Sequence, residues 1–198
     1  SDVITKHFVD SLLLVLAAPE LGLKLDASSK YSCIDVGTGA GFPGIPLKIA
    51  FPGLKITLLD SLNKRVGFLN EVIEALGLTD ITAVHGRAED YGRDPKYREQ
   101  FDLCVSRAVA NMSTLSEYCI PFVKKGGYFI PYKSGKADEE IEQAKSAVKK
   151  LGGELKEVIV KVLPETDVER TFVPVKKMAV TAKKYPRKAG LPGKEPLK

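Results

Sequence analysis

The sequence is poor in the residues that build metal centres and disulfide frameworks. It has three cysteines, two histidines and no tryptophan among its 198 residues. Cys33, Cys104 and Cys119 form no Cys-x-x-Cys pair, and neither His7 nor His85 has a partner at metal-ligand spacing. We therefore expect buried, reduced thiols, a cytoplasmic protein and no metal site.

Long apolar runs are also missing. The longest, residues 12–18, stops at Pro19, whereas a transmembrane helix needs about 20 apolar residues. The start shows no secretory signal, and because it lacks methionine we expect residues upstream of Ser1. A composition of 44% hydrophobic and 28% charged residues is typical of a globular protein.

The basic residues are distributed unevenly. The net charge is +5, yet residues 176–198 carry eight basic residues and a single acid, Glu195. This basic end indicates a polyanionic partner such as nucleic acid, because cations that neutralise phosphates release counterions. A solvated end that aids solubility is the alternative. We divide the chain into a body of residues 1–182 and a basic C-terminal tail of residues 183–198.

Hydrophobic periodicity predicts an α/β fold. Apolar residues at helical spacing predict a helix over residues 3–17 that ends before Pro19. Short apolar runs then alternate with helical patterns, as in a parallel, doubly wound sheet. Two final runs, residues 154–163 and 171–180, have no helix between them and should pair antiparallel. The first four predicted strands are residues 32–36, 55–59, 81–84 and 102–105.

A glycine-rich segment follows the first predicted strand. Gly37, Gly39 and Gly41 lack side chains, so the backbone can turn sharply and lie against a ligand. Parallel sheets bind ligands at the carboxyl ends of their strands, which makes this turn a predicted site. Asp35 stands two residues before the first glycine, and Asp60 ends the second strand.

Two ligand classes fit this segment. The spacing Gly39-x-Gly41-x-x-Gly44 matches a dinucleotide fingerprint, with Asp60 placed to bind a ribose. The alternative is S-adenosylmethionine, because a carboxylate at Asp35 repels a pyrophosphate and suits the amino and sulfonium charges of the methyl donor. Asp60 can bind the ribose of either ligand. A tight turn without a ligand is the third interpretation.

The chain carries two long motifs, Asp35-Val-Gly-Thr-Gly-Ala-Gly-Phe-Pro-Gly-Ile-Pro46 and Leu58-Leu-Asp-Ser-Leu-Asn-Lys-Arg65. Together with several shorter motifs, they resemble the small-subunit ribosomal RNA methyltransferase G family, also called glucose-inhibited division protein B. The shorter motifs are Lys6-His-Phe-Val-Asp-Ser11, Ser106-Arg-Ala108 and Glu169-Arg170, and residues 184–192 resemble the tail of members from Gram-positive lineages. The resemblance covers essentially the whole chain.

The resemblance implies a class I methyltransferase with a Rossmann-like, mostly parallel seven-stranded sheet and a terminal antiparallel hairpin. It implies methyl transfer from S-adenosylmethionine to N7 of a guanine in 16S ribosomal RNA, within the small subunit or an assembly intermediate. The donor-site residues that follow from motif position and from the glycine segment are Asp35, Gly37, Gly39, Phe42, Asp60, Ser61, Leu62, Ala88, Glu89 and Arg107.

Arginines, rather than a general base, are the catalytic candidates. A guanine N7 already has a lone pair, so methyl transfer should depend on positioning and electrostatics. The sequence lacks the Asn/Asp-Pro-Pro-aromatic motif of amino-directed methyltransferases and the Pro-Cys nucleophile of cytosine C5 enzymes. Arg107 can contact the donor or the guanine edge. Arg87 and Arg170 are further candidates, with surface ion pairs as the alternative.

Other polar residues of the body are expected to contact RNA. Lys64 and Arg65 occupy the first turn of a predicted helix, where cations oppose the helix dipole. Lys133 follows the fifth predicted strand and can bind phosphate. The resemblance also assigns His7 to RNA binding, although a histidine on an apolar helix face is commonly a packed core residue.

The basic tail is expected to contact RNA through Lys183, Lys184 and Arg187, because Pro186 and Gly190 keep this stretch out of a helix. We therefore expect its removal to weaken RNA binding and to leave donor binding intact. An NAD-dependent oxidoreductase and a non-catalytic RNA-binding module remain alternatives. The oxidoreductase interpretation gives the tail no use and lacks an evident second substrate domain.

Overall fold

The computed structural model describes residues 3–135 and 137–198. Its N-terminal segment is helical and comprises η1 (Ile4–Val9), α1 (Asp10–Leu12), α2 (Leu14–Ala17) and η2 (Ala18–Leu21). The α-helix ends at Ala17, before Pro19 as predicted, and the chain then continues into the 3₁₀ helix η2. Pro19 lies in the first turn of η2, where its missing amide hydrogen costs no hydrogen bond, and the segment turns at Gly22, whose φ is 70°.

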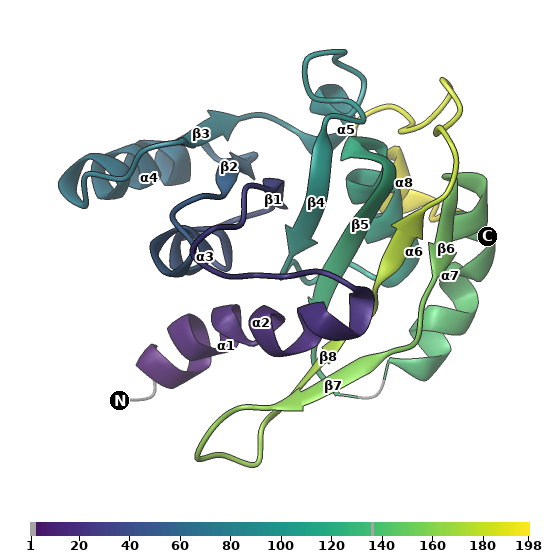
Figure 1. Ribbon diagram of the computed structural model, residues 1–198. Helices are drawn as coiled ribbons and strands as arrows, with labels where there is room; N and C mark the ends of the chain where they lie inside the picture. The colour runs from purple at the N-terminus through teal and green to yellow at the C-terminus, as the bar shows by residue number, and fades with distance from the viewer. Residues whose placement is uncertain (1–2, 136) are drawn as a thin grey trace.

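The centre of the fold is a parallel sheet (Figure 1). Its strands follow the order β3-β2-β1-β4-β5, so the direction of strand addition reverses between β1 and β4. The four predicted strands are confirmed, and their ends differ from prediction by at most one residue. The bounds are β1 (Ser32–Val36), β2 (Lys55–Asp60), β3 (Ile81–His85), β4 (Phe101–Ser106) and β5 (Val123–Lys133).

Successive side chains of the central strands point to opposite faces of the sheet, and each face packs in its own apolar core. Cys33, Leu58 and Leu103 pack on one face with the N-terminal segment, α3 and α4. Ile34 and Leu59 pack on the other face with α6 and α7. The cysteines are buried and free, as predicted. The helices after β1 are α3 (Gly44–Ala50), α4 (Asn63–Ala75), α5 (Ala88–Tyr91), α6 (Met112–Cys119), η3 (Ile120–Phe122) and α7 (Asp138–Lys150).

The two final apolar runs pair antiparallel, as predicted, through Val160 with Thr171 and Glu154 with Lys176. Each run is broken into two strands, so the described residues form a nine-stranded sheet rather than a seven-stranded one. Pro174 explains one break, because it has no amide hydrogen to donate to the ladder. The strands are β6 (Gly153–Leu155), β7 (Ile159–Val162), β8 (Glu169–Phe172) and β9 (Val175–Lys177).

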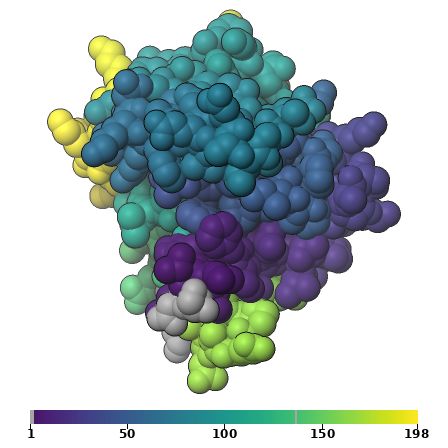
Figure 2. Space-filling model, turned by 90° about the vertical axis from the view of Figure 1, so that its left-hand side faces the viewer, coloured from purple at the N-terminus to yellow at the C-terminus, as the bar shows by residue number. Residues whose placement is uncertain are grey.

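The C-terminal tail packs against the body. In Figure 1 its yellow trace passes α5 and continues into the short helix α8 (Leu191–Lys194) beside α6. Tyr185 is buried. Figure 2 shows the N-terminal segment in purple, next to the lime-green turn between β7 and β8. Within the described ranges, no helix is long and apolar enough to cross a membrane.

Candidate active site

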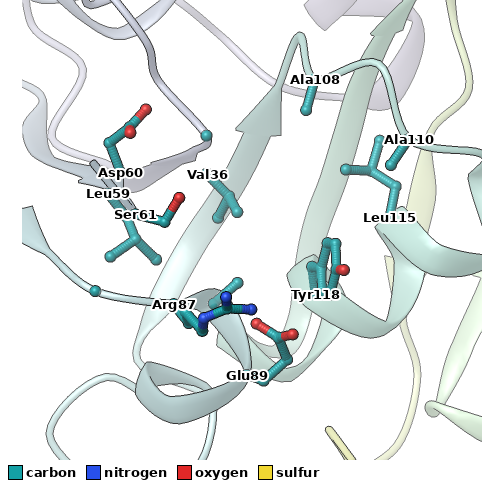
Figure 3. Close-up of a pocket in the computed structure, with 13 residues that line it drawn as sticks. Val36, Leu59, Asp60, Ser61, Arg87, Glu89, Ala108, Ala110, Leu115 and Tyr118 are labelled. Atoms are coloured by element: carbon teal, nitrogen blue, oxygen red, sulfur yellow. The ribbon is translucent and has the colours of Figure 1, made fainter. Parts of the chain in front are cut away.

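A cavity of about 200 Å³ lies at the carboxyl ends of β1, β2, β3 and β4, where the strand order reverses. We refer to it as the donor cavity. In Figure 3, Asp60 and Ser61 lie on one side, Leu115 and Tyr118 on the other, and Arg87 and Glu89 at the lower edge. The sequence-predicted residues that line it are Gly37, Asp60, Ser61, Arg87, Ala88 and Glu89.

The glycine loop folds back onto the second strand. The amides of Gly37 and Thr38 both donate to the Leu59 carbonyl, at 2.9 and 3.1 Å. Gly37 has a φ of 70°, a left-handed value that suits glycine. Gly44 is required for a different reason, since a Cβ there would lie 2.3 Å from a Leu58 methyl group. The loop thus presents bare backbone to the cavity.

Asp35 stabilises this loop from below. Its Oδ2 accepts hydrogen bonds from the Thr38 hydroxyl at 2.7 Å and from the Gly44 amide at 2.9 Å. The side chain is fully buried and is not part of the cavity lining. Burial raises the pKa of this carboxyl to about 6. Its Oδ1 has no hydrogen-bond partner among the described residues. Asp35 therefore stabilises the glycine loop and does not itself line the cavity.

Asp60 joins the loop to the turn after β2. Its Oδ2 accepts from the Gly39 amide and its Oδ1 from the Leu62 amide, each at 2.9 Å. Arg65 lies 3.4 Å from Oδ2 through Nη1. Oδ1 has a second lone pair, so Asp60 can also accept from a ligand. Gly39 and Leu62 meet Asp60 through their backbones, and neither is part of the cavity lining.

A second cavity, of about 360 Å³, adjoins the donor cavity. Ala108 and Ala110 line both, so the segment after β4 forms a shared wall. Three predicted site residues, Arg107, Lys133 and Arg170, bring their side chains to this second cavity. We call it the cationic cavity.

Asp10 holds two of these cations, and sequence reasoning missed it. Its Oδ2 lies 2.9 Å from Nη1 of Arg107 and 2.8 Å from Nη2 of Arg170, and its Oδ1 lies 2.7 Å from Nε of Arg170. Asp10 is fully buried. The available signal was a carboxylate in the Lys6–Ser11 motif, one residue before an apolar helical stretch. Lys133 is held separately, with Nζ 2.6 Å from Glu140 Oε1.

Phe42 lies outside the donor cavity and packs against the N-terminal segment instead. Its ring centroid is 5.4 Å from that of His7 and 5.0 Å from that of Phe8. The Arg107 guanidinium carbon lies 5.6 Å from the centroid of the Phe42 ring, and Nη2 of Arg107 lies 3.1 Å from Nδ1 of His7. His7 and Phe42 therefore orient Arg107.

The remaining predicted RNA-binding residues fall into two groups. Lys64, Arg65, Lys183 and Lys184 are exposed. Arg187 is not free to bind phosphate, because its guanidinium forms hydrogen bonds of 2.8–3.2 Å to the fully buried Glu117. No group of three or more histidine, cysteine, aspartate or glutamate residues within 3–135 and 137–198 is arranged to hold a metal ion.

Comparisons with known proteins identify relatives over the whole chain. Residues 1–173 match the family described as rRNA small subunit methyltransferase G. Proteins named ribosomal RNA small subunit methyltransferase G from Lachnoclostridium phytofermentans and Acetivibrio thermocellus are 54% and 52% identical, over 99% of this chain and 78% and 77% of theirs.

Solved structures share the fold at low sequence identity. Fibrillarin from Aeropyrum pernix, with natively bound S-adenosyl-L-methionine, gives a TM-score of 0.60 at 15% identity over 85% of this chain and 76% of that one. Precorrin-6y C5,15-methyltransferase from Geobacter metallireducens gives 0.56 at 14% identity over 82% and 86%. The expected class I methyltransferase fold is confirmed.

Proposed function

Because the chain belongs to the rRNA small subunit methyltransferase G family, we propose that it transfers a methyl group from S-adenosylmethionine to N7 of a guanine in 16S ribosomal RNA. The observation that carries the proposal is the pair of adjoining cavities, one at the carboxyl ends of the strands and one lined by cations. Family membership sets the NAD-dependent oxidoreductase aside. The cytoplasm, where ribosomal RNA is made in bacteria, is the proposed location.

The donor cavity fits the nucleoside part of S-adenosylmethionine. Gly37 leaves backbone open to the ligand, and Asp60 and Glu89 are buried carboxylates at its lining, which suits hydroxyl and amine donors. Val36, Leu59 and Leu115 supply apolar surface for a purine ring. When bound there, S-adenosylmethionine supplies an electrophilic methyl group on a sulfonium.

The cationic cavity is the proposed site of the target guanine. The charges of Arg107, Lys133 and Arg170 exceed those of Asp10 and Glu140 there, which favours an approaching phosphate backbone. A guanidinium can donate to guanine O6 and orient the base. Since N7 reacts through its lone pair, no side chain has to accept a proton. The purine gains positive charge in the reaction, so a guanidinium is proposed to contact O6 rather than the reacting N7.

Methyl transfer to RNA tests this function directly. The purified protein is incubated with S-adenosylmethionine labelled in its methyl group and either deproteinised 16S RNA or intact small ribosomal subunits. We expect label in guanine at N7, at one position, located by borohydride reduction and aniline cleavage. The better substrate of the two defines the assembly stage at which the enzyme acts. Donor binding without transfer to either RNA would support the non-catalytic RNA-binding module instead.

Lys183 and Lys184 are proposed to contact RNA phosphates, because both are exposed on the outer side of the tail. Replacing both with glutamine should reduce the slope of log affinity against log salt by about 1.4, given about 0.7 per phosphate contact on single strands. RNA affinity measured at several salt concentrations checks this. The charge-matched control, Lys145→Gln with Lys149→Gln on α7, should leave the slope unchanged. An equal change of slope in both double variants would show that the effect depends on the net charge of the protein and not on contacts of the tail.

A further inference from the structure

The C-terminal tail contacts a residue of the donor cavity directly. The amide of Gly190 donates a hydrogen bond of 2.8 Å to Oε1 of Glu89. Glu89 is buried at the start of α5 and lines the donor cavity. The two residues are 101 positions apart in the sequence. A hydrogen bond to a buried carboxylate fixes the direction in which its second oxygen points, so Gly190 sets how Glu89 meets a ligand.

The tail also contacts α6, the helix that neighbours α5. Arg187 forms a bidentate pair with Glu117, with Nη2–Oε2 at 2.8 Å and Nε–Oε1 at 3.0 Å. This contact raises the pKa of Arg187. Tyr118, the next residue of α6, lines the donor cavity. The Thr114 hydroxyl of the same helix donates to the Pro192 carbonyl at 3.0 Å.

Two further arginines hold the tail backbone in place. Nη1 of Arg98 lies 2.7 Å from the Tyr185 carbonyl oxygen, and Nη2 of Arg98 lies 2.6 Å from that of Thr181. Nε of Arg93 lies 2.8 Å from the Pro186 carbonyl oxygen. Charge-assisted hydrogen bonds of this kind are stronger than neutral ones. The tail is therefore anchored on the N-terminal side of the stretch that touches Glu89 and α6.

We propose that residues 185–193 support the lining of the donor cavity from behind, and that Gly190 positions Glu89 for donor binding. This deepens the proposed function and rests on it. It also replaces the expectation that removing residues 183–198 leaves donor binding intact. The tail has two faces: its exposed lysines are available to RNA, while its buried contacts shape the donor site.

Gly190 offers a test through a matched pair of variants. Its φ is 84°, a left-handed value, and a Cβ at this position would meet nothing within 4 Å. Asparagine tolerates this backbone conformation, whereas β-branched valine does not. Gly190→Val should therefore move the amide away from Glu89 without a steric clash. We expect it to weaken S-adenosylmethionine binding about tenfold, the effect of losing one hydrogen bond to a charged group.

Calorimetric titration of the donor and RNA-binding measurements give the two readouts. Gly190→Asn should keep both affinities within about twofold of the wild type, and Gly190→Val should lose donor affinity alone. Unchanged donor affinity in Gly190→Val, or equal losses in both variants, would overturn the proposal. A wild-type protein that does not bind the donor would contradict the proposed function instead.

Hydrogen exchange on the wild-type protein provides the second test, for use if circular dichroism shows that Gly190→Val is unfolded. Saturating S-adenosylmethionine should slow amide exchange in peptides that cover residues 186–194, because a donor bound at Glu89 stabilises the contacts of the tail with Glu89 and α6. Peptides over residues 158–168, in the hairpin outside both cavities, are the internal control and should not change. Unaltered exchange in residues 186–194 would overturn the proposal.

Discussion

Asp10→Ala should lower the free energy of unfolding by about 3 kcal/mol. Asp10 is fully buried and is the common partner of Arg107 and Arg170. Removing it leaves two like charges close together without their counter-ion, at the point where the N-terminal segment meets the sheet. We expect the low end of the range for broken buried pairs, because each arginine side chain keeps 17–18% of its surface exposed. Urea unfolding followed by circular dichroism measures this change.

An exposed ion pair serves as the control for Asp10. Glu20 and Lys161 also join the N-terminal segment to the β7–β8 hairpin, but Glu20 is half exposed. Exposed pairs contribute about 0–1 kcal/mol, so Glu20→Ala should change the free energy of unfolding by less than about 1 kcal/mol. Similar losses in the two variants would contradict the role given to burial here. A wild-type-like Asp10→Ala would show that the arginines find water or other partners.

Features that depend on local sequence could be predicted. The strands β1, β2 and β4 are rich in apolar residues because both of their faces are buried, whereas β3, at the edge of the sheet, is only partly buried. The glycine loop is local too: Gly37 and Gly44 are required by a turn and by a close approach within one strand–helix unit. Asp60 follows from its place at the end of β2. These features place Gly37 and Asp60 at the donor cavity.

Features that depend on contacts between distant residues could not be predicted. Asp10 meets Arg107 across 97 residues and Arg170 across 160, and no spacing rule connects them. The tail was expected to contact RNA because its composition is basic, and no contact with the body was predicted. Composition does not show that the body has two buried carboxylates, Glu117 and Glu89. Arg187 donates hydrogen bonds to Glu117, and the Gly190 amide donates one to Glu89. The same limit explains why Phe42 was assigned to the donor site, since the rings that it contacts belong to the distant N-terminal segment.

Arg107→Ala should reduce the single-turnover rate of methyl transfer about 100-fold, the effect of losing one preorganised donor in an active site, while changing donor affinity by less than about threefold. Arg107 lines the cationic cavity and not the donor cavity. Asp10, His7 and the Phe42 ring orient its guanidinium. A side chain held this firmly orients the guanine without a reorganisation cost. Rates at saturating donor and RNA, together with donor titration, separate the two effects.

Arg107→Lys is the matched variant, because it keeps the charge and removes the planar fork. If Arg107 orients the guanine through directed hydrogen bonds to O6, which leave the N7 lone pair free to react, the lysine variant should recover little of the rate. If Arg107 acts as a point charge on phosphate, lysine should restore most of it. Equal losses of rate and donor affinity in Arg107→Ala would make Arg107 a donor-binding residue. Full activity would leave it the structural role of neutralising Asp10, which Arg170 shares.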